Sequence, residues 1–277
     1  MKITSDSHLH SAFSGDCDAP MEDMIRRGMA LGFDRLCFTE HMDMDYPISD
    51  SAPEGFFVVD TEAYLAKYTR LRDKYGGDIQ LGFGIELGLH PQHVNDNADY
   101  VRSHPFDMVI ASTHIVNGKD PYLPEYFAGR GDKAAYREYF EASLENVRQF
   151  DDFDVYGHLD YVLRYGAEAA PLSAAREHFY SDHADVIEEI LAVLVQKNKG
   201  LEINTSALRN RLPEPHPCAA ILKRFRELGG ECVSIGSDAH TPESIGMAFD
   251  RARDILMACG FSRHAIFTAR KAEYVSL

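Results

Sequence analysis

The chain of 277 residues lacks tryptophan, contains only five cysteines and has no CxxC pair. The cysteines are scattered and odd in number, which argues against a disulfide-stapled miniprotein and a cysteine-rich zinc site. No stretch approaches the roughly 20 apolar residues of a membrane-spanning helix. The first residues also lack the apolar segment of a secretion signal. These absences predict a cytoplasmic protein that does not bind membranes.

Positive charge is also in short supply. There are 28 Lys and Arg residues against 44 Asp and Glu, so the net charge is −16 with histidine neutral. Such a surface repels polyanions at long range, and we therefore expect no nucleic-acid partner. Hydrophobic residues make up 45% of the chain and charged residues 26%, which is typical of a globular protein.

Short apolar runs alternate with amphipathic stretches along the whole chain. Strands are expected at residues 3–5, 35–38, 79–85, 107–111, 154–156, 201–203 and 232–235. Helices are expected at residues 20–31, 61–75, 132–150, 178–199, 217–228 and 242–258. This alternation predicts a single α/β domain over residues 1–277, either a closed parallel barrel or an open doubly wound sheet. The first predicted strand is not followed by a GxGxxG motif, which argues against a dinucleotide site.

Histidine is abundant, with 13 residues, and histidines or carboxylates follow nearly every predicted strand. The residues placed in this way are His8, His10, His41, Glu86, His114, His158, Asp238 and His240. A parallel barrel brings all its strand ends to one rim, which is where barrel enzymes carry their chemistry. We therefore expect these side chains to form a metal site, to which Asp16 can add a further ligand.

Histidine and carboxylate ligands suit zinc, manganese or iron(II). The ligands are too many for one ion, so two or three clustered cations are expected. Clustered divalent ions are typical of phosphoester hydrolysis.

The other histidines are interpreted differently. His178 and His183 lie in a helical pattern and are expected at a solvated surface, whereas His104 and His264 flank strands at the opposite end and are expected to be structural. No role is assigned to His90, His93 and His216.

Six motifs in order along the chain resemble the PHP family, named for polymerase and histidinol phosphatase. They are Asp6-Ser7-His8-Leu9-His10, Thr39-Glu40-His41, Gly84-Ile85-Glu86, Ser112-Thr113-His114, Gly157-His158-Leu159-Asp160 and Gly236-Ser237-Asp238-Ala239-His240. Three further segments resemble the stand-alone histidinol-phosphatase branch of that family. They span residues 113–122, 158–165 and 202–209.

The resemblance implies a distorted seven-stranded (β/α) barrel, TIM-like in plan, with three divalent metal ions. Carried over residue by residue, the first ion takes His8, His10, Glu86 and Asp238. The second takes His114 and His158, with Glu86 as a bridge, and the third takes Asp16, His41 and His240. Many relatives have histidine at the position of Asp16, and aspartate there can change which metal is preferred.

The implied reaction is hydrolysis of the phosphomonoester L-histidinol phosphate to L-histidinol and phosphate, a step of histidine biosynthesis. Arg164 and Arg209 are expected to bind the phosphate of this small-molecule substrate, since guanidinium groups bind phosphate oxygens in a bidentate way. Arg211 is the alternative to Arg209. Two long loops, at residues 42–60 and 115–131, are expected to hold the rest of the substrate. Their candidate residues are Asp43, Asp45, Phe56 and Tyr122.

Three alternatives remain open at this point. One is a PHP phosphoesterase that acts on a nucleotide or sugar phosphate. Another is a metal-dependent amidohydrolase, because those barrels also begin with HxH, although the usual bridging lysine is not evident here. The third is a non-catalytic scaffold, which is disfavoured because the full set of ligands is present.

Overall fold

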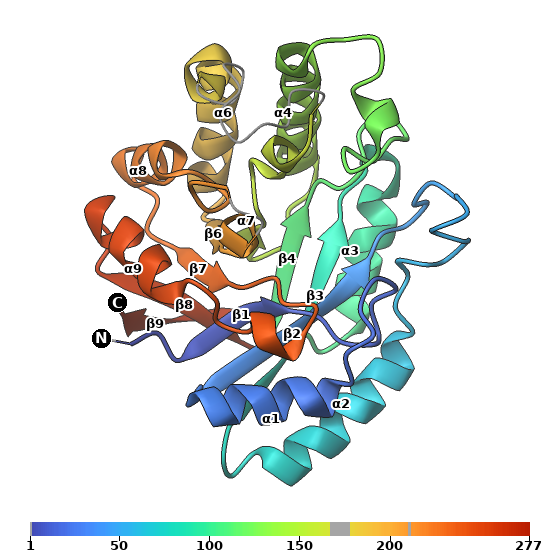
Figure 1. Ribbon diagram of the computed structural model, residues 1–277, viewed down its shortest axis with the longest axis vertical. Coiled ribbons are helices and arrows are strands. Elements are labelled where there is room, and N and C mark those ends of the chain that lie inside the picture. The colour runs from blue at the N-terminus through green and yellow to red at the C-terminus, as the bar shows by residue number, and fades with distance from the viewer. Residues whose placement is uncertain (1, 167–177, 210–211) are drawn as a thin grey trace.

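The computed structural model describes residues 2–166, 178–209 and 212–277 (Figure 1). Seven strands pair side by side in sequential order, and every pair is parallel. These strands are β1 (Ser5–Leu9), β2 (Arg35–Met42), β3 (Gln80–Gly88), β4 (Met108–Ser112), β5 (Val155–Tyr156), β6 (Gly200–Asn204) and β7 (Val233–Gly236). Nearly every strand residue is buried, as expected for a parallel sheet that is covered on both faces.

The first and last strands of the sheet meet just beyond the end of β7. Leu9 forms a parallel bridge with Ala239. The Asp238 N–H donates to the His8 carbonyl at 2.8 Å, and the His10 N–H donates to the Ala239 carbonyl at 2.9 Å. The sheet is therefore a nearly closed, distorted (β/α)7 barrel. The barrel prediction is confirmed, and the open doubly wound alternative is wrong.

Helices connect consecutive strands and lie outside the barrel (Figure 1). They are α1 (Met21–Leu31), α2 (Thr61–Tyr75), α3 (Val94–Ser103), α4 (Asp132–Gln149), α6 (Phe179–Gln196), α7 (Ser206–Arg209), α8 (Ala219–Glu227) and α9 (Phe249–Ala258). Local chemistry fixes several ends. The Asp60 side chain caps α2 by accepting from the Ala63 N–H, and Gly32 ends α1 in the left-handed conformation.

Three of the helices described differ from the sequence prediction. The helix expected over residues 242–258 begins only at Phe249, after a 3₁₀ turn at Pro242–Ser244. Gly246 and Ala248 between them have φ angles of 64° and 62°, which a right-handed helix cannot include. The helices α3 and α7 were not predicted.

A C-terminal hairpin, also absent from the prediction, closes the N-terminal end of the barrel. It consists of the antiparallel strands β8 (Arg263–Thr268) and β9 (Lys271–Ser276). Ala265 and Phe267 of β8 join an apolar cluster whose barrel members are Cys37, Met108, Ile110 and Val155. The hairpin thus covers the strand ends opposite the rim that carries the polar residues.

The helices within the described part of the chain include none that is long and apolar enough to cross a membrane.

Candidate metal centre

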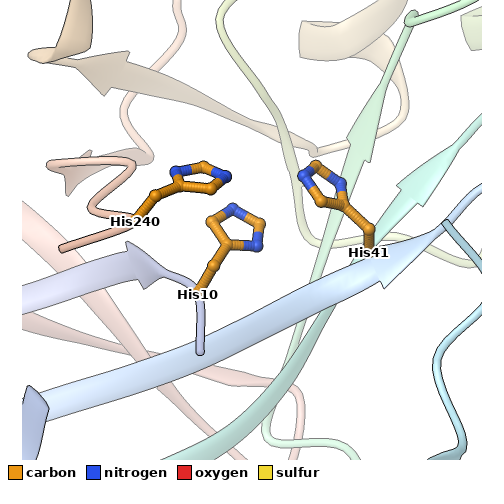
Figure 2. A group of neighbouring side chains, drawn as sticks. All are labelled: His10, His41 and His240. Carbon is orange, nitrogen blue, oxygen red and sulfur yellow. The ribbon is translucent and has the colours of Figure 1, made fainter. Parts of the chain in front are cut away.

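The nine side chains predicted as ligands lie together at the C-terminal rim of the barrel. They come from β1, β2 and β3 and from the segments that follow β1, β4, β5 and β7. Parallel pairing sets some of these positions directly, since His41 of β2 is in register with Glu86 of β3. Figure 2 shows three of them, His10, His41 and His240, gathered from separate segments of the chain.

The donor atoms fall into three overlapping groups, and within each group they lie within 4.8 Å of one another. The groups are His10, His41 and His240; His8, His10 and Asp238; and His41, Glu86 and His114. Buried histidine and carboxylate groups that overlap in this way indicate several metal sites. Asp16 extends the first group, because its carboxylate lies 3.2 Å from His240 Nε2 and 3.7 Å from His41 Nε2.

Glu86 lies at the centre of this arrangement and is 1% exposed. Its Oε1 atom is 2.8 Å from His158 Nε2 and 3.2 Å from His114 Nε2. Its Oε2 atom is 3.1 Å from His8 Nε2 and 3.2 Å from His41 Nδ1. The two oxygens therefore face two different sets of imidazoles, which is the geometry that a bridging carboxylate needs.

The proton positions in this cluster fit bound cations. His8 Nδ1–H donates to Glu202 Oε1 at 2.6 Å, and His114 Nδ1–H donates to Asp43 Oδ1 at 2.7 Å. A metal-bound imidazole is neutral and carries one N–H, so in that form the Nε2 atoms of both rings would present lone pairs toward Glu86. Acceptors that face acceptors in a buried site would repel each other, and a divalent cation between them removes the repulsion. The donor set therefore fits metal ions.

Charge and burial oppose each other at these ligands. Burial lowers the pKa of His8 and His114, but the carboxylates beside these rings raise it well above its usual value, so without a cation between them both rings are protonated. Burial alone would raise the pKa of Glu86, but the charge of these two protonated rings holds that pKa well below its usual value. Burial, together with the nearby charges of His240 and His41, lowers the pKa of His10 to about 3. His10 is therefore neutral at physiological pH and can offer a lone pair.

Several supporting carboxylates escaped the sequence analysis. Glu40 is fully buried beneath the first loop, where Ser14 Oγ–H donates to it at 2.6 Å and the Ser11 N–H at 3.0 Å. Burial raises its pKa to about 7. Glu202 and Asp43 hold His8 and His114, respectively. Asp43, a predicted substrate-binding residue, thus supports a candidate ligand and also lines the cavity at the metal centre.

The two predicted phosphate-binding arginines have different surroundings. Arg164 lines the cavity at the metal centre, with its guanidinium 5.0 Å from the Tyr161 ring centroid. Arg209 donates to the backbone carbonyls of Ser237 and Asp238 and is not among the residues that line that cavity. Arg211 lies outside the described residues.

The inner cavity, of about 90 Å³, opens toward a larger one of about 400 Å³. Both are lined by Asp16, Tyr46, Phe57, Asp120, Tyr161 and Arg164. Phe56 and Tyr122, two of the predicted loop residues, line the larger cavity. Asp45 does not, and its carboxylate pairs instead with His93 at 2.8 Å.

Of the other histidines, His183 contradicts its predicted place, since it is 1% exposed where a solvated position was expected. It lies at a break inside α6 and packs near Phe140, so its burial comes from the contact between two helices. His178 is exposed, as expected for a solvated residue. His264 in β8 is buried, as expected for a structural residue. His216, left unassigned, is buried and its Nδ1 pairs with Asp160 at 2.5 Å.

A nearly closed parallel barrel with a buried cluster of histidines and carboxylates at its C-terminal rim defines a class of metal-binding barrel hydrolases. Comparison with known proteins identifies the family within this class. The profile of the PHP domain matches residues 6–206.

Relatives match over nearly the full length of the chain. The histidinol-phosphatase of Lactococcus lactis is 30% identical over 269 residues, which cover 97% of this chain and 96% of that protein. The histidinol-phosphatase of Saccharomyces cerevisiae is 22% identical and covers 90% of this chain and 88% of its own. The chain therefore belongs to the PHP domain family, and the family prediction is confirmed.

Solved structures agree. The crystal structure of histidinol phosphate phosphatase from Lactococcus lactis, complexed with zinc, L-histidinol and phosphate, superposes with a TM-score of 0.88 at 29% identity. It covers 99% of this chain and 100% of its own. A Listeria monocytogenes structure, at 20% identity and a TM-score of 0.74, shares the fold. Family, fold and site together make this protein a PHP-family metal-dependent phosphoesterase.

Proposed function

We propose that this protein hydrolyses L-histidinol phosphate to L-histidinol and phosphate, using three divalent metal ions. The observation that carries this proposal is the position of Glu86, whose two oxygens face separate sets of imidazoles. The relative from Lactococcus lactis, complexed with zinc, L-histidinol and phosphate, supports both the metal and the substrate class. The ions are zinc, manganese or iron(II), all of which accept this donor set.

The proposed ligands follow the overlapping groups of donors. His8, His10, Glu86 and Asp238 would hold the first ion. Glu86, His114 and His158 would hold the second, and Asp16, His41 and His240 the third. When bound, clustered divalent ions supply positive charge to phosphoryl oxygens and lower the pKa of water so that it can attack phosphorus.

The protein residues then orient the substrate. Arg164 lines the cavity, with its Nη2 3.8 Å from Asp238 Oδ2, and can donate two hydrogen bonds to phosphate oxygens. Its role is to fix the phosphate so that the leaving oxygen points away from the attacking water. Arg209 remains a second candidate, although its donors are directed to backbone carbonyls.

The larger cavity offers room for the leaving group. Its walls carry the aromatic rings of Tyr46, Phe57 and Tyr161, and the buried carboxyl group of Asp120 lies among them. The Tyr46 hydroxyl and the Tyr122 N–H both donate to Asp120 and fix its orientation. Aromatic faces beside a carboxyl group suit a flat, nitrogen-bearing group such as imidazole.

A substrate panel tests the proposal. Phosphate release is measured for the metal-loaded protein on histidinol phosphate, a nucleoside monophosphate, a hexose phosphate and p-nitrophenyl phosphate, with an amide substrate alongside. We expect the highest kcat/KM on histidinol phosphate. A higher value on the nucleotide or sugar phosphate would refute this specificity, and cleavage of the amide alone would show an amidohydrolase. Inactivity of a fully metallated protein on every compound would support the scaffold alternative.

A further inference from the structure

The strand β6 provides no candidate metal ligand, yet it carries a row of buried polar side chains. Glu202, Asn204 and Ser206, the last at the start of α7, are each 0% exposed. Alternate residues of a strand point to the same face, so Glu202 and Asn204 lie on one side of β6. Buried polar groups are costly unless they are hydrogen-bonded, so their partners indicate what they do.

The inner end of the row holds two candidate metal ligands. Glu202 Oε1 accepts from His8 Nδ1–H at 2.6 Å, and Oε2 accepts from the His158 N–H at 3.0 Å. Asn204 Nδ2–H donates to the same Oε2 atom at 3.2 Å. Glu202 therefore orients the His8 ring and fixes its tautomer, while Asn204 completes the hydrogen bonds of the carboxylate.

The outer end of the row holds the arginine at the cavity. Arg164 Nη2–H donates to Ser206 Oγ at 2.6 Å, and Ser206 Oγ–H donates to Asn204 Oδ1 at 2.5 Å. The Ser206 N–H also donates to Asn204 Oδ1, at 3.0 Å, and so fixes which end of the amide faces outward. The single hydroxyl proton of Ser206 is thus directed away from Arg164, which leaves its oxygen free to accept from the guanidinium.

A glycine on the neighbouring strand β7 makes room for the carboxylate. A Cβ atom on Gly236, at the end of β7, would lie 2.3 Å from Glu202 Oε1 and 2.4 Å from His8 Cβ. Any larger residue at position 236 would displace Glu202 or His8. The space around Glu202 is therefore built into the barrel on the side of β7.

We propose that Glu202, Asn204 and Ser206 are positioning residues that fix the guanidinium of Arg164 relative to the candidate metal ligand His8. The hydrogen-bonded chain from Arg164 through Ser206 and Asn204 to Glu202 ends on His8, so the phosphate-binding group and the metal centre share one rigid support. This inference rests on the proposed function, in which Arg164 binds the phosphate. The strand β6, which provides no candidate metal ligand, thus supports both the phosphate-binding arginine and the metal centre.

A double-mutant cycle of Ser206→Ala and Arg164→Ala tests the outer link. The measured quantities are the Kd for inorganic phosphate, kcat/KM on p-nitrophenyl phosphate and the metal content of the metal-loaded protein. We expect Ser206→Ala to weaken phosphate binding by about fivefold to tenfold at unchanged metal content, less than the loss of a direct charged contact, because Ser206 does not touch the phosphate itself. In the Arg164→Ala background the same change should have no further effect, because Ser206 acts through Arg164. Effects that multiply, or an unchanged Kd in Ser206→Ala, would overturn the proposal.

The inner link is tested with Asn204→Asp, which replaces the donor to Glu202 with a second carboxylate oxygen. We expect phosphate affinity and metal affinity to fall together, each by about tenfold. A loss confined to phosphate affinity would overturn the shared support. Ser234→Ala on β7 is the matched control, because its buried hydroxyl lacks a hydrogen-bond partner within the described ranges. It should leave all three quantities within about twofold of the wild type.

The outcome for this inference can be separated from that of the proposed function. If the wild-type protein binds phosphate and shows the coupling but hydrolyses neither histidinol phosphate nor p-nitrophenyl phosphate, the proposed function fails and the positioning role stands. If it hydrolyses both while the two substitutions act independently, the positioning role fails and the proposed function stands.

Discussion

The two ends of the barrel both carry carboxylates next to strand termini, but these carboxylates face different partners. At the N-terminal end, Asp107 accepts from the backbone N–H groups of Phe83 and Ala269, each at 2.9 Å. At the C-terminal end, the oxygens of Glu86 face imidazole nitrogens such as His8 Nε2, and the neutral, metal-binding form of the His8 ring directs its one N–H at Glu202. A carboxylate that accepts hydrogen bonds from backbone N–H groups stabilises the fold. A carboxylate that faces the lone pairs of neutral imidazoles forms, together with them, a site for cations.

Substitutions at the C-terminal rim of the barrel, the upper rim, are therefore expected to change metal content and turnover. Substitutions at its N-terminal end, the lower end, are expected to change stability. Glu86→Gln should have the largest effect. The amide loses the charge shared by two ions, so turnover should fall by about a thousandfold or more, together with metal content. Phosphate release and elemental analysis measure the two quantities. Full metal content at a near-normal rate would show that Glu86 is not a bridge.

Phe267→Ala should have the largest effect at the lower end. Phe267 is buried where the hairpin closes the barrel, so its truncation leaves a cavity that costs about 3–4 kcal/mol of unfolding free energy. Urea denaturation measures this loss, and kcat/KM of the folded protein should stay within about twofold. Phe267→Leu, a milder change, provides a second measurement if the alanine variant does not fold. A loss of turnover in a stable, folded variant would contradict the separation of the two ends.

Arg164→Ala at the upper rim should lower kcat/KM by about ten- to hundredfold, which corresponds to a charge-assisted contact of about 1.5–3 kcal/mol. Arg164→Lys should recover only part of this loss, because an ammonium group cannot reproduce the planar two-point contact. Steady-state kinetics provide the measurement, and elemental analysis shows whether the metals remain in place. Unchanged kinetics in a fully metallated alanine variant would show that Arg164 does not bind the substrate.

The smallest of these effects is expected for Asp107→Ala, which leaves two backbone N–H groups at the lower end without their acceptor. The unfolding free energy should fall by about 1–2 kcal/mol, with metal content and turnover unchanged. Asp107→Asn keeps one acceptor oxygen and should recover about half of the loss. Thermal or urea unfolding of the two variants provides the measurement, and equal stability of the wild type and the alanine variant would refute the structural role.

The barrel and its polar rim could be predicted from the sequence because both follow from local pattern. Short apolar runs alternate with amphipathic stretches, and His8 and His10 follow a strand with a spacing of two. The start of α9 could not be predicted, because it depends on the positive φ of Ala248, a residue that rarely adopts this conformation. The hairpin escaped prediction because every residue of β9 is exposed and the inward side of β8 is buried only by the barrel itself.

The supports of the candidate site were missed for a different reason. Glu40, Asp43 and Glu202 are acidic residues in a chain that has 44 of them, and most acids lie at the surface. Only the folded barrel shows that these three are buried and bonded to the first loop, His114 and His8, respectively. For Glu202, the available signal was its alternation with Asn204 along the otherwise apolar strand β6.

The number of metal ions bound per chain decides whether the rim of the barrel holds a cluster of cations. The three overlapping groups of donors at the upper rim predict about three divalent ions per chain after loading with zinc or manganese and removal of free metal. Elemental analysis of the wild-type protein, with Glu86→Gln beside it, should show this stoichiometry and its decrease in the variant. One ion or none in the active wild-type protein, or an equal content in the two proteins, would contradict it.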